Sequence, residues 1–197
     1  MNYIAHRINT INSLLKLPTK FGVEIDLRDN DTRIVLEHDP FSDGEDFENY
    51  LKHYNHGILI LNIKSERIEH KVLELVEKYN IKNYFLLDSS FPMIYLLSQM
   101  GEKNIALRFS EYEGLDTILA MKGKVDWVWV DCFSNLPINQ ANFKILKEAG
   151  FKLCLVSPEL QGRPEDIEKY KIYLEKNKII FDAICTKFHN IERWKNI

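Results

Sequence analysis

Short apolar runs recur along the chain and alternate with segments of helical periodicity. A strand buried on both faces is an almost continuous apolar run, whereas a helix repeats its apolar residues every three or four positions. Eight runs meet the first description, at residues 3–6, 22–27, 57–63, 83–87, 104–109, 125–130, 152–156 and 182–186. Residues 68–79 and 139–149 have the helical spacing, and the latter segment ends at Gly150. Alternating strands and helices predict a parallel sheet.

Eight strand-helix units are what a (β/α)8 TIM barrel requires, and a length of 197 residues is near the lower limit of that fold. The competing fold is an open, doubly wound sheet. Neither of the glycine-rich phosphate loops that accompany such sheets follows the first run. We therefore predict one compact α/β barrel domain over residues 1–197, with exposed loops at residues 39–44 and 157–164.

The composition narrows the classes of partner. The chain is 45% hydrophobic and 28% charged, and its formal net charge is −3, so it lacks the basic surface typical of nucleic-acid binding. No stretch reaches the roughly 18 to 20 apolar residues of a membrane span, and the first residues do not resemble a secretion signal. We expect a soluble, cytoplasmic protein with no transmembrane segment and no nucleic-acid partner.

The three cysteines, Cys132, Cys154 and Cys185, lie in or beside apolar runs. Their odd number and wide spacing disfavour a disulfide framework, and no CxxC pair offers a zinc site. We expect three buried thiols that serve packing.

Polar residues close several of the apolar runs. His6 and Arg7 end the first run, and His38 follows a short run at residues 34–36. Catalytic residues of an α/β barrel lie at the carboxyl ends of its strands. Histidine suits general acid and base work near neutral pH, and arginine can bind a phosphate through two parallel hydrogen bonds.

Two carboxylates share one face of the second run. Glu24, Asp26 and Arg28 project to the same side, because alternate residues of a strand share a face. Neighbouring carboxylates repel unless a divalent cation, an arginine or a shared proton offsets their charge. An ordinary half-exposed strand could carry the same residues, but the two histidines favour a catalytic site.

These residues fall into three short motifs in the order HR, ExD and HD, at His6-Arg7, Glu24-Ile25-Asp26 and His38-Asp39. The order and spacing resemble the opening of the glycerophosphodiester phosphodiesterase family, within the phosphatidylinositol phospholipase C-like barrel superfamily. Further along, residues 61–64 resemble the strand that carries another metal ligand in that family.

The resemblance implies a phosphoric diester hydrolase. His6 and His38 would form the acid/base pair, Arg7 would bind the phosphate, and Glu24 and Asp26 would hold a divalent cation such as Mg, Ca or Mn. In this scheme the metal neutralises the nonbridging oxygens, and one histidine protonates the leaving alkoxide. The substrate would be a small phosphodiester, such as a glycerophosphodiester, a related phospholipid head group or a glycan phosphodiester.

The chain departs from the family in its third metal ligand. One register puts Asn62 in place of a carboxylate, with Lys64 as the phosphate-binding lysine; the other puts Lys64 there, with Glu66 beyond it. A metal held with fewer anionic ligands should bind more weakly. Ile8 also replaces the glycine that follows HR in the family.

Two alternatives stay open. Bacterial phospholipases C of the superfamily need no metal and use an arginine two residues after an aspartate, a spacing met here by Asp26 and Arg28. Loss of the third carboxylate is also compatible with a barrel that binds a phosphate or phosphosugar without cleaving it efficiently. Only residues 40–56 separate the HD motif from the next run, so the family's capping insertion should be short or absent and the mouth more open.

Other strand ends also carry polar residues. Four of them, Asp88, Arg108, Asp131 and Glu159, are expected to form hydrogen bonds with the rim loops rather than to catalyse. Trp127 and Trp129 share one face of their strand, and we expect them to pack inside the barrel.

Overall fold

All eight apolar runs form strands in the computed structural model, which describes residues 1–195. The strands are β1 (Asn2–Ala5), β2 (Gly22–Asn30), β3 (Arg33–Leu36), β4 (Glu45–Asp46), β5 (Leu59–Ile63), β6 (Tyr84–Leu87), β7 (Ala106–Phe109), β8 (Trp127–Val130), β9 (Lys152–Val156) and β10 (Ala183–Thr186). The eight expected strands are β1, β2 and β5 to β10. β9 has the expected bounds, and the other seven begin or end up to three residues away from their runs.

Helices connect these strands. They are α1 (Ile11–Lys16), α2 (Phe47–Leu51), α3 (Glu69–Lys78), α4 (Phe91–Gln99), α5 (Leu115–Ala120), α6 (Gln140–Glu148), α7 (Asp166–Lys176) and α8 (Ile191–Trp194), with 3-10 turns η1 (Pro158–Gln161) and η2 (Phe188–Asn190). The two helices expected from periodicity are α3 and α6. Gly150 follows α6 with a φ of +94°, a left-handed conformation that ends a helix without steric cost when the residue is glycine.

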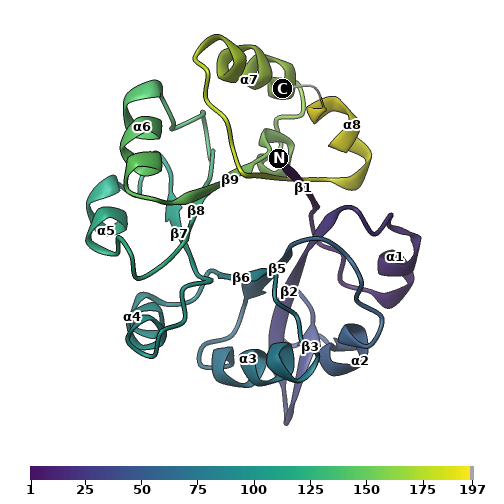
Figure 1. Ribbon diagram of the computed structural model, residues 1–197. Coiled ribbons are helices and arrows are strands. Elements are labelled where there is room, and N and C mark those ends of the chain that lie inside the picture. Colours follow the sequence, from purple (N-terminus) through teal and green to yellow (C-terminus); the bar gives the residue numbers. More distant parts are fainter. Residues whose placement is uncertain (196–197) are drawn as a thin grey trace.

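The strands form one mixed sheet of ten. Parallel ladders join β5 to β6 and β2, β2 to β1, and then β1, β10, β9, β8 and β7 in succession. Between β6 and β7 the pairing is limited to one isolated bridge, Leu86 to Ile105. In Figure 1 the strands surround the middle of the molecule and the helices lie outside them. The fold is therefore mixed α/β, and its ladder is not closed between β6 and β7.

The segment at residues 40–56, between β3 and β5, is small. β3 pairs antiparallel with the second half of β2, β4 pairs with β3, and the short helix α2 follows. The loop at residues 39–44 is exposed or half-buried, which confirms that prediction. The expected exposed loop at residues 157–164 was wrong for its first part, because Ser157 and Pro158 are buried and the chain turns into η1.

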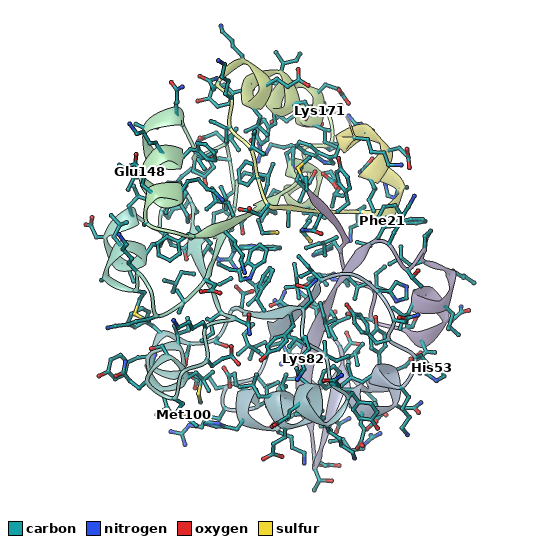
Figure 2. The ribbon with its side chains drawn as sticks, in the orientation of Figure 1. Phe21, His53, Lys82, Met100, Glu148 and Lys171 are labelled. Carbon is teal, nitrogen blue, oxygen red and sulfur yellow. The ribbon has the colours of Figure 1, made fainter. Side chains whose placement is uncertain are left out.

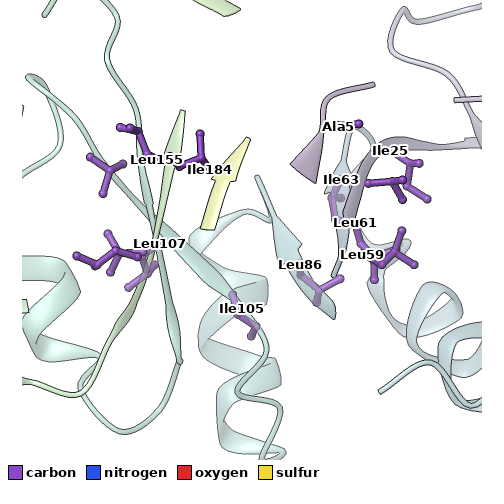
Figure 3. Packing of buried hydrophobic residues seen from close by; sticks show 14 of the residues in the cluster. Ala5, Ile25, Leu59, Leu61, Ile63, Leu86, Ile105, Leu107, Leu155 and Ile184 are labelled. Carbon is purple, nitrogen blue, oxygen red and sulfur yellow. The ribbon is translucent and has the colours of Figure 1, made fainter. Parts of the chain in front are cut away.

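Alternate residues of the strands pack on the two faces of the sheet. One face packs against the helices, through residues such as Ile25, Leu59 and Leu61 (Figure 3). The other face forms a second apolar cluster that includes Phe85 and Trp127, whose rings stack with centroids 4.6 Å apart. Side chains fill the space between the strands (Figure 2).

The predictions for the tryptophans and the cysteines are confirmed. Trp127 and Trp129 are buried in the second cluster, and Cys132, Cys154 and Cys185 are buried free thiols. Among the helices of residues 1–195, none combines the length and the apolar character needed to cross a membrane.

Candidate active site

The pairing of β1 with its two neighbours brings three distant segments together. Ala5 at the end of β1 pairs with Val23 of β2 on one side and with Thr186 of β10 on the other. The residues that follow, His6, Glu24 and Lys187, therefore meet although up to 181 positions separate them. On the other side of β2, Glu24 pairs with Ile60 and Asp26 pairs with Asn62 of β5.

Glu24 is completely buried, and both of its carboxylate oxygens accept hydrogen bonds. Its Oε1 accepts a hydrogen bond from Asn62 Nδ2 at 2.8 Å, and its Oε2 accepts one from the Arg7 backbone N–H at 2.7 Å. His6 Nε2 lies 3.7 Å from Oε2. Burial, and next the charge of Asp26, raise the pKa of Glu24 to about 7, so the carboxyl is partly protonated near neutral pH.

Asp26 is also buried and lies among cations. Its Oδ2 accepts a hydrogen bond from Asn9 Nδ2 at 2.9 Å and lies 3.3 Å from Arg7 Nε, and its Oδ1 lies 3.7 Å from Lys64 Nζ. Asn9 also accepts a hydrogen bond from the Asp26 backbone N–H at 3.0 Å. Asn9 thus fixes both the backbone and the side chain of Asp26, a role that the sequence did not predict.

His6 has a cationic partner. Its Nδ1 lies 3.0 Å from Lys187 Nζ, and its side chain is 17% exposed. Burial lowers the pKa of His6 to about 3, and the charges of Lys187, Arg7, Lys64 and His38 act in the same direction. The imidazole is therefore neutral at physiological pH.

His38 lies at the same end of the sheet but on the rim. Its side chain is 40% exposed, and its Nδ1 lies 2.7 Å from Asp39 Oδ1. This hydrogen bond lowers the pKa of Asp39. Arg28 donates two hydrogen bonds to the His38 carbonyl, at 3.0 and 3.2 Å, and so supports the rim rather than the buried carboxylates.

The predicted site residues therefore divide into two groups. A central group of His6, Arg7, Glu24, Asp26, Asn62 and Lys64 is joined by direct contacts. His38 and Arg28 lie beside it, and their side chains touch no member of the central group in the described part of the chain. The charge of His38 is the smallest of the causes that lower the pKa of His6.

A chain of ion pairs extends the site across the sheet. Lys64 Nζ lies 3.2 Å from Asp88 Oδ2, Asp88 pairs with Arg108, and Arg108 pairs with Asp131. The prediction that these polar residues bind loops holds for Asp131, which accepts hydrogen bonds from the Cys132 backbone and the Gln161 side chain. Arg108 also lies 3.8 Å from Glu113 of the loop after β7, and in addition it pairs with Asp88, which pairs with Lys64 on its other side.

A cavity of about 630 Å³ adjoins this chain, between the ends of β6 and β7. Asp88, Arg108 and Glu113 line its polar side, and Leu107 and Ile118 line its apolar side. It lies where the β6–β7 ladder is reduced to one bridge. The sequence did not predict it, because an apolar run does not reveal which strand pair is incomplete.

Two residues of the site have left-handed backbone conformations. The φ angles of Arg7 and Asp88 are +58° and +60°, values that are uncommon for residues other than glycine and that concentrate at functional sites. Arg7 gains from it a backbone hydrogen bond to Glu24. Ile8, which follows Arg7, does not have a positive φ, so this position does not require glycine.

Whether a metal ion could bind here depends on the atoms that the buried side chains offer as ligands. Three buried side chains, from Glu24, Asp26 and Asn62, carry carboxylate or amide oxygens, the ligand atoms that a hard divalent cation prefers. Asp26 Oδ1 and Asn62 Oδ1 are buried without a hydrogen-bond partner, which is consistent with an oxygen-liganded cation. Within residues 1–195, however, no group of three or more His, Cys, Asp or Glu side chains is arranged to hold a metal, and Lys64 already faces Asp26. The side chains present therefore suit a divalent cation that is bound by two carboxylates and one amide oxygen.

Comparison with known proteins adds no family assignment: no protein-family model matches the sequence, and no curated protein matches it.

Proposed function

We propose that this protein is a phosphoric diester hydrolase that uses His6 and His38 as its acid/base pair. The observation that carries the proposal is the contact of His6 and of the cations Arg7 and Lys64 with two buried carboxylates, Glu24 and Asp26. Burying two carboxylates side by side is costly, and no apolar core requires it.

The proposal includes the architecture. We infer a compact (β/α)8 TIM barrel of the phospholipase C-like type, without a large capping insertion. The cyclic order of the eight parallel strands, the outer position of the helices and the Leu86 to Ile105 bridge support it. In such a barrel the candidate site lies at the carboxyl ends of the strands, which is where barrel enzymes carry their chemistry.

The cations account for phosphate binding. A phosphodiester carries one negative charge, which increases in the transition state as the attacking oxygen bonds to phosphorus. Arg7 and Lys64 both flank Asp26, and a single carboxylate cannot neutralise two cations, although Lys64 is also paired with Asp88. They are therefore suited to bind the nonbridging oxygens and to gain strength as charge develops.

A divalent cation would be held by Glu24, Asp26 and Asn62. When bound, it would supply Lewis-acid neutralisation of the nonbridging oxygens. Asn62 itself orients Glu24 through its amide, and Asn9 orients Asp26. These amides restrict the orientation of each carboxylate whether or not a cation is present.

The cavity beside Asp88 and Arg108 supports a substrate larger than a glycerol diester. Its volume of about 630 Å³ is within the range of small-molecule sites, and Asp88 joins it to Lys64. One alcohol group of the diester would enter this cavity, as a lipid head group or part of a glycan.

A metal-free lyase of the phospholipase C type is the second candidate. Arg7 and Lys64 both pair with Asp26, so the chain's own cations already occupy positions at which a metal would act. In this version the Arg28 guanidinium gives up its hydrogen bond to the His38 carbonyl and binds the phosphate instead.

The test is hydrolysis of a panel that runs from bis(4-nitrophenyl) phosphate to glycerophosphodiesters, with Mg, Mn or Ca, or with chelator. We expect turnover that metal increases, and loss of about 100-fold or more for His38→Ala, the usual value of an acid/base group. His53→Ala, which changes an exposed histidine outside the site, is the matched control and should retain wild-type rates.

Turnover that resists chelator and fails in Arg28→Ala would favour the metal-free lyase instead. Absence of turnover with every substrate and metal would reject the hydrolase and favour a barrel that only binds a phosphate or phosphosugar.

A further inference from the structure

Lys187 contacts a histidine of the candidate site, although no motif of the sequence marks it. It follows the last strand, β10, and its Nζ lies 3.0 Å from His6 Nδ1. Its position is fixed by its own backbone, whose N–H donates to Glu159 Oε1 at 3.0 Å. Glu159 also binds the preceding residue, Thr186, through the threonine hydroxyl.

The contact determines which nitrogen of His6 carries the proton. An ammonium group has three N–H donors and no acceptor, so His6 Nδ1 must accept the hydrogen bond and must be unprotonated. A neutral imidazole has one N–H, which is then on Nε2. The Nε2 side faces Glu24 Oε2 at 3.7 Å, an acceptor consistent with that tautomer.

His38 has the opposite partner. Its Nδ1 lies 2.7 Å from the carboxylate of Asp39, which accepts a hydrogen bond, so Nδ1 carries the proton and Nε2 is free to accept one. A carboxylate at Nδ1 is the arrangement that orients a histidine as a general base. The two histidines are thus set in opposite tautomers by partners of opposite charge.

We propose that Lys187 is a positioning residue that holds His6 as the Nε2–H tautomer and thereby makes His6 the proton donor, with His38 as the base. This inference rests on the proposed hydrolase function for its catalytic half, but not for the tautomer itself. It assigns the two roles that the sequence motifs leave interchangeable.

The proton balance of the step follows. Water loses a proton to His38 Nε2 and its oxygen bonds to phosphorus, while the bond from phosphorus to the leaving oxygen breaks. His6 Nε2 gives its proton to that oxygen, and Lys187 transfers one proton to His6 Nδ1, so that no imidazolate forms. The products are an alcohol and a phosphomonoester. To close the cycle, His6 Nδ1 returns its proton to Lys187, His38 releases one proton to solvent, and His6 Nε2 takes up one proton from solvent.

The tautomer is tested first, on protein labelled with 15N at histidine, by a long-range 1H–15N correlation spectrum in chelator at neutral pH. We expect the wild-type His6 signal to show an unprotonated Nδ1 and a protonated Nε2. Lys187→Met should shift both nitrogens toward averaged values, and Lys187→Arg, which keeps a donor, should preserve the wild-type pattern. The control is Lys147→Met, because Lys147 is a partly buried lysine paired with Asp182 instead of the site.

The catalytic role is tested by leaving-group dependence. An alkoxide needs a proton to leave, whereas 4-nitrophenolate does not, so a defect in proton donation is confined to the alkyl substrate. We expect Lys187→Met and His6→Gln to lose about 100-fold in kcat on a glycerophosphodiester and less than about 5-fold on bis(4-nitrophenyl) phosphate. His38→Ala should lose activity on both.

Two results would overturn the inference: a wild-type His6 with its proton on Nδ1, or a His6 pattern that Lys187→Met leaves unchanged. Equal losses on the alkyl and aryl substrates would refute the role in proton donation. Because the spectrum needs no turnover, it tests the tautomer even if the protein cleaves none of the diesters.

Discussion

Replacing Asn62 by aspartate tests how the two buried carboxylates are balanced. Asn62 is 7% exposed, pairs with Asp26 across the β2–β5 ladder and donates from Nδ2 to Glu24 Oε1 at 2.8 Å. Asn62→Asp keeps the volume of the side chain, removes that donor and adds a third negative charge. It also supplies the carboxylate that the family resemblance expects at this position.

These contacts set the free energy of unfolding that Asn62→Asp should lose when chelator keeps metal away. A hydrogen bond to a charged acceptor contributes about 1.5–3 kcal/mol, and a carboxylate facing Glu24 adds repulsion, so we expect a loss of roughly 2–4 kcal/mol. For a chain of this size, each kcal/mol lowers the melting temperature by about 2–4 °C. The expected decrease is therefore about 4–16 °C. A divalent cation at 100 times its Kd would restore about 2.7 kcal/mol.

The assay is thermal denaturation followed by circular dichroism, in chelator and with Mg, Mn or Ca. Asn62→Leu removes the same donor without adding charge, and Asn83→Asp adds the same charge at an exposed position. We expect only Asn62→Asp to regain stability with metal. If Asn62→Asp is as stable as wild type in chelator, or if metal restores Asn62→Leu equally, the assignment of this position as an oxygen ligand beside Glu24 is refuted.

Two further predictions concern pH and packing. The raised pKa of Glu24 makes stability fall as the pH rises from 4.5 to about 7, whereas the lowered pKa of His6 makes it rise from about pH 3 to 6.5. Urea denaturation gives the free energy of unfolding, and its value for the wild type minus that for His6→Gln should increase by up to about 1.4 kcal/mol per pH unit from about pH 3 to 6.5. A difference that stays constant over this interval would contradict the buried, neutral environment assigned to His6. Phe85→Ala, which removes a fully buried ring stacked on Trp127, should cost about 3–5 kcal/mol, against under about 0.5 for the exposed Tyr95→Ala.

The eight main strands could be predicted because strands buried on both faces leave continuous apolar runs. Glu24 and Asp26 could be assigned to one face of β2 because they are two residues apart. Asn62 lies beside them because the pairing of β5 with β2 places it opposite Asp26. The antiparallel β3 was visible only as a short run. Its pairing with the extended second half of β2 depends on a turn of two residues, which the run itself does not specify.

The contacts that were missed are long-range or involve residue types that rarely mark sites. Lys187 lies 181 residues from His6, and only the position of β10 beside β1 brings them together. A signal did exist, because Thr186 and Lys187 close the last apolar run as His6 and Arg7 close the first. Ser157 was placed in an exposed loop because of the prolines and glycine around it, but its hydroxyl binds buried Trp194.

The charges of the central group indicate why an anion suits it. Arg7 and Lys64 contact Asp26, and Lys187 lies beside the group on His6. Against Glu24, Asp26 and the Asp88 carboxylate that also pairs with Lys64, these three cations leave no net charge when Glu24 is ionised and one positive charge when it is protonated. A pKa near 7 for Glu24 therefore lets the site hold an excess of positive charge at neutral pH. Under the proposed function, a diester with one negative charge would match that excess. In the proposed site, Asp26 would then have a second role beside holding a divalent cation, because it fixes the positions of Arg7 and Lys64, the cations proposed to bind the phosphate.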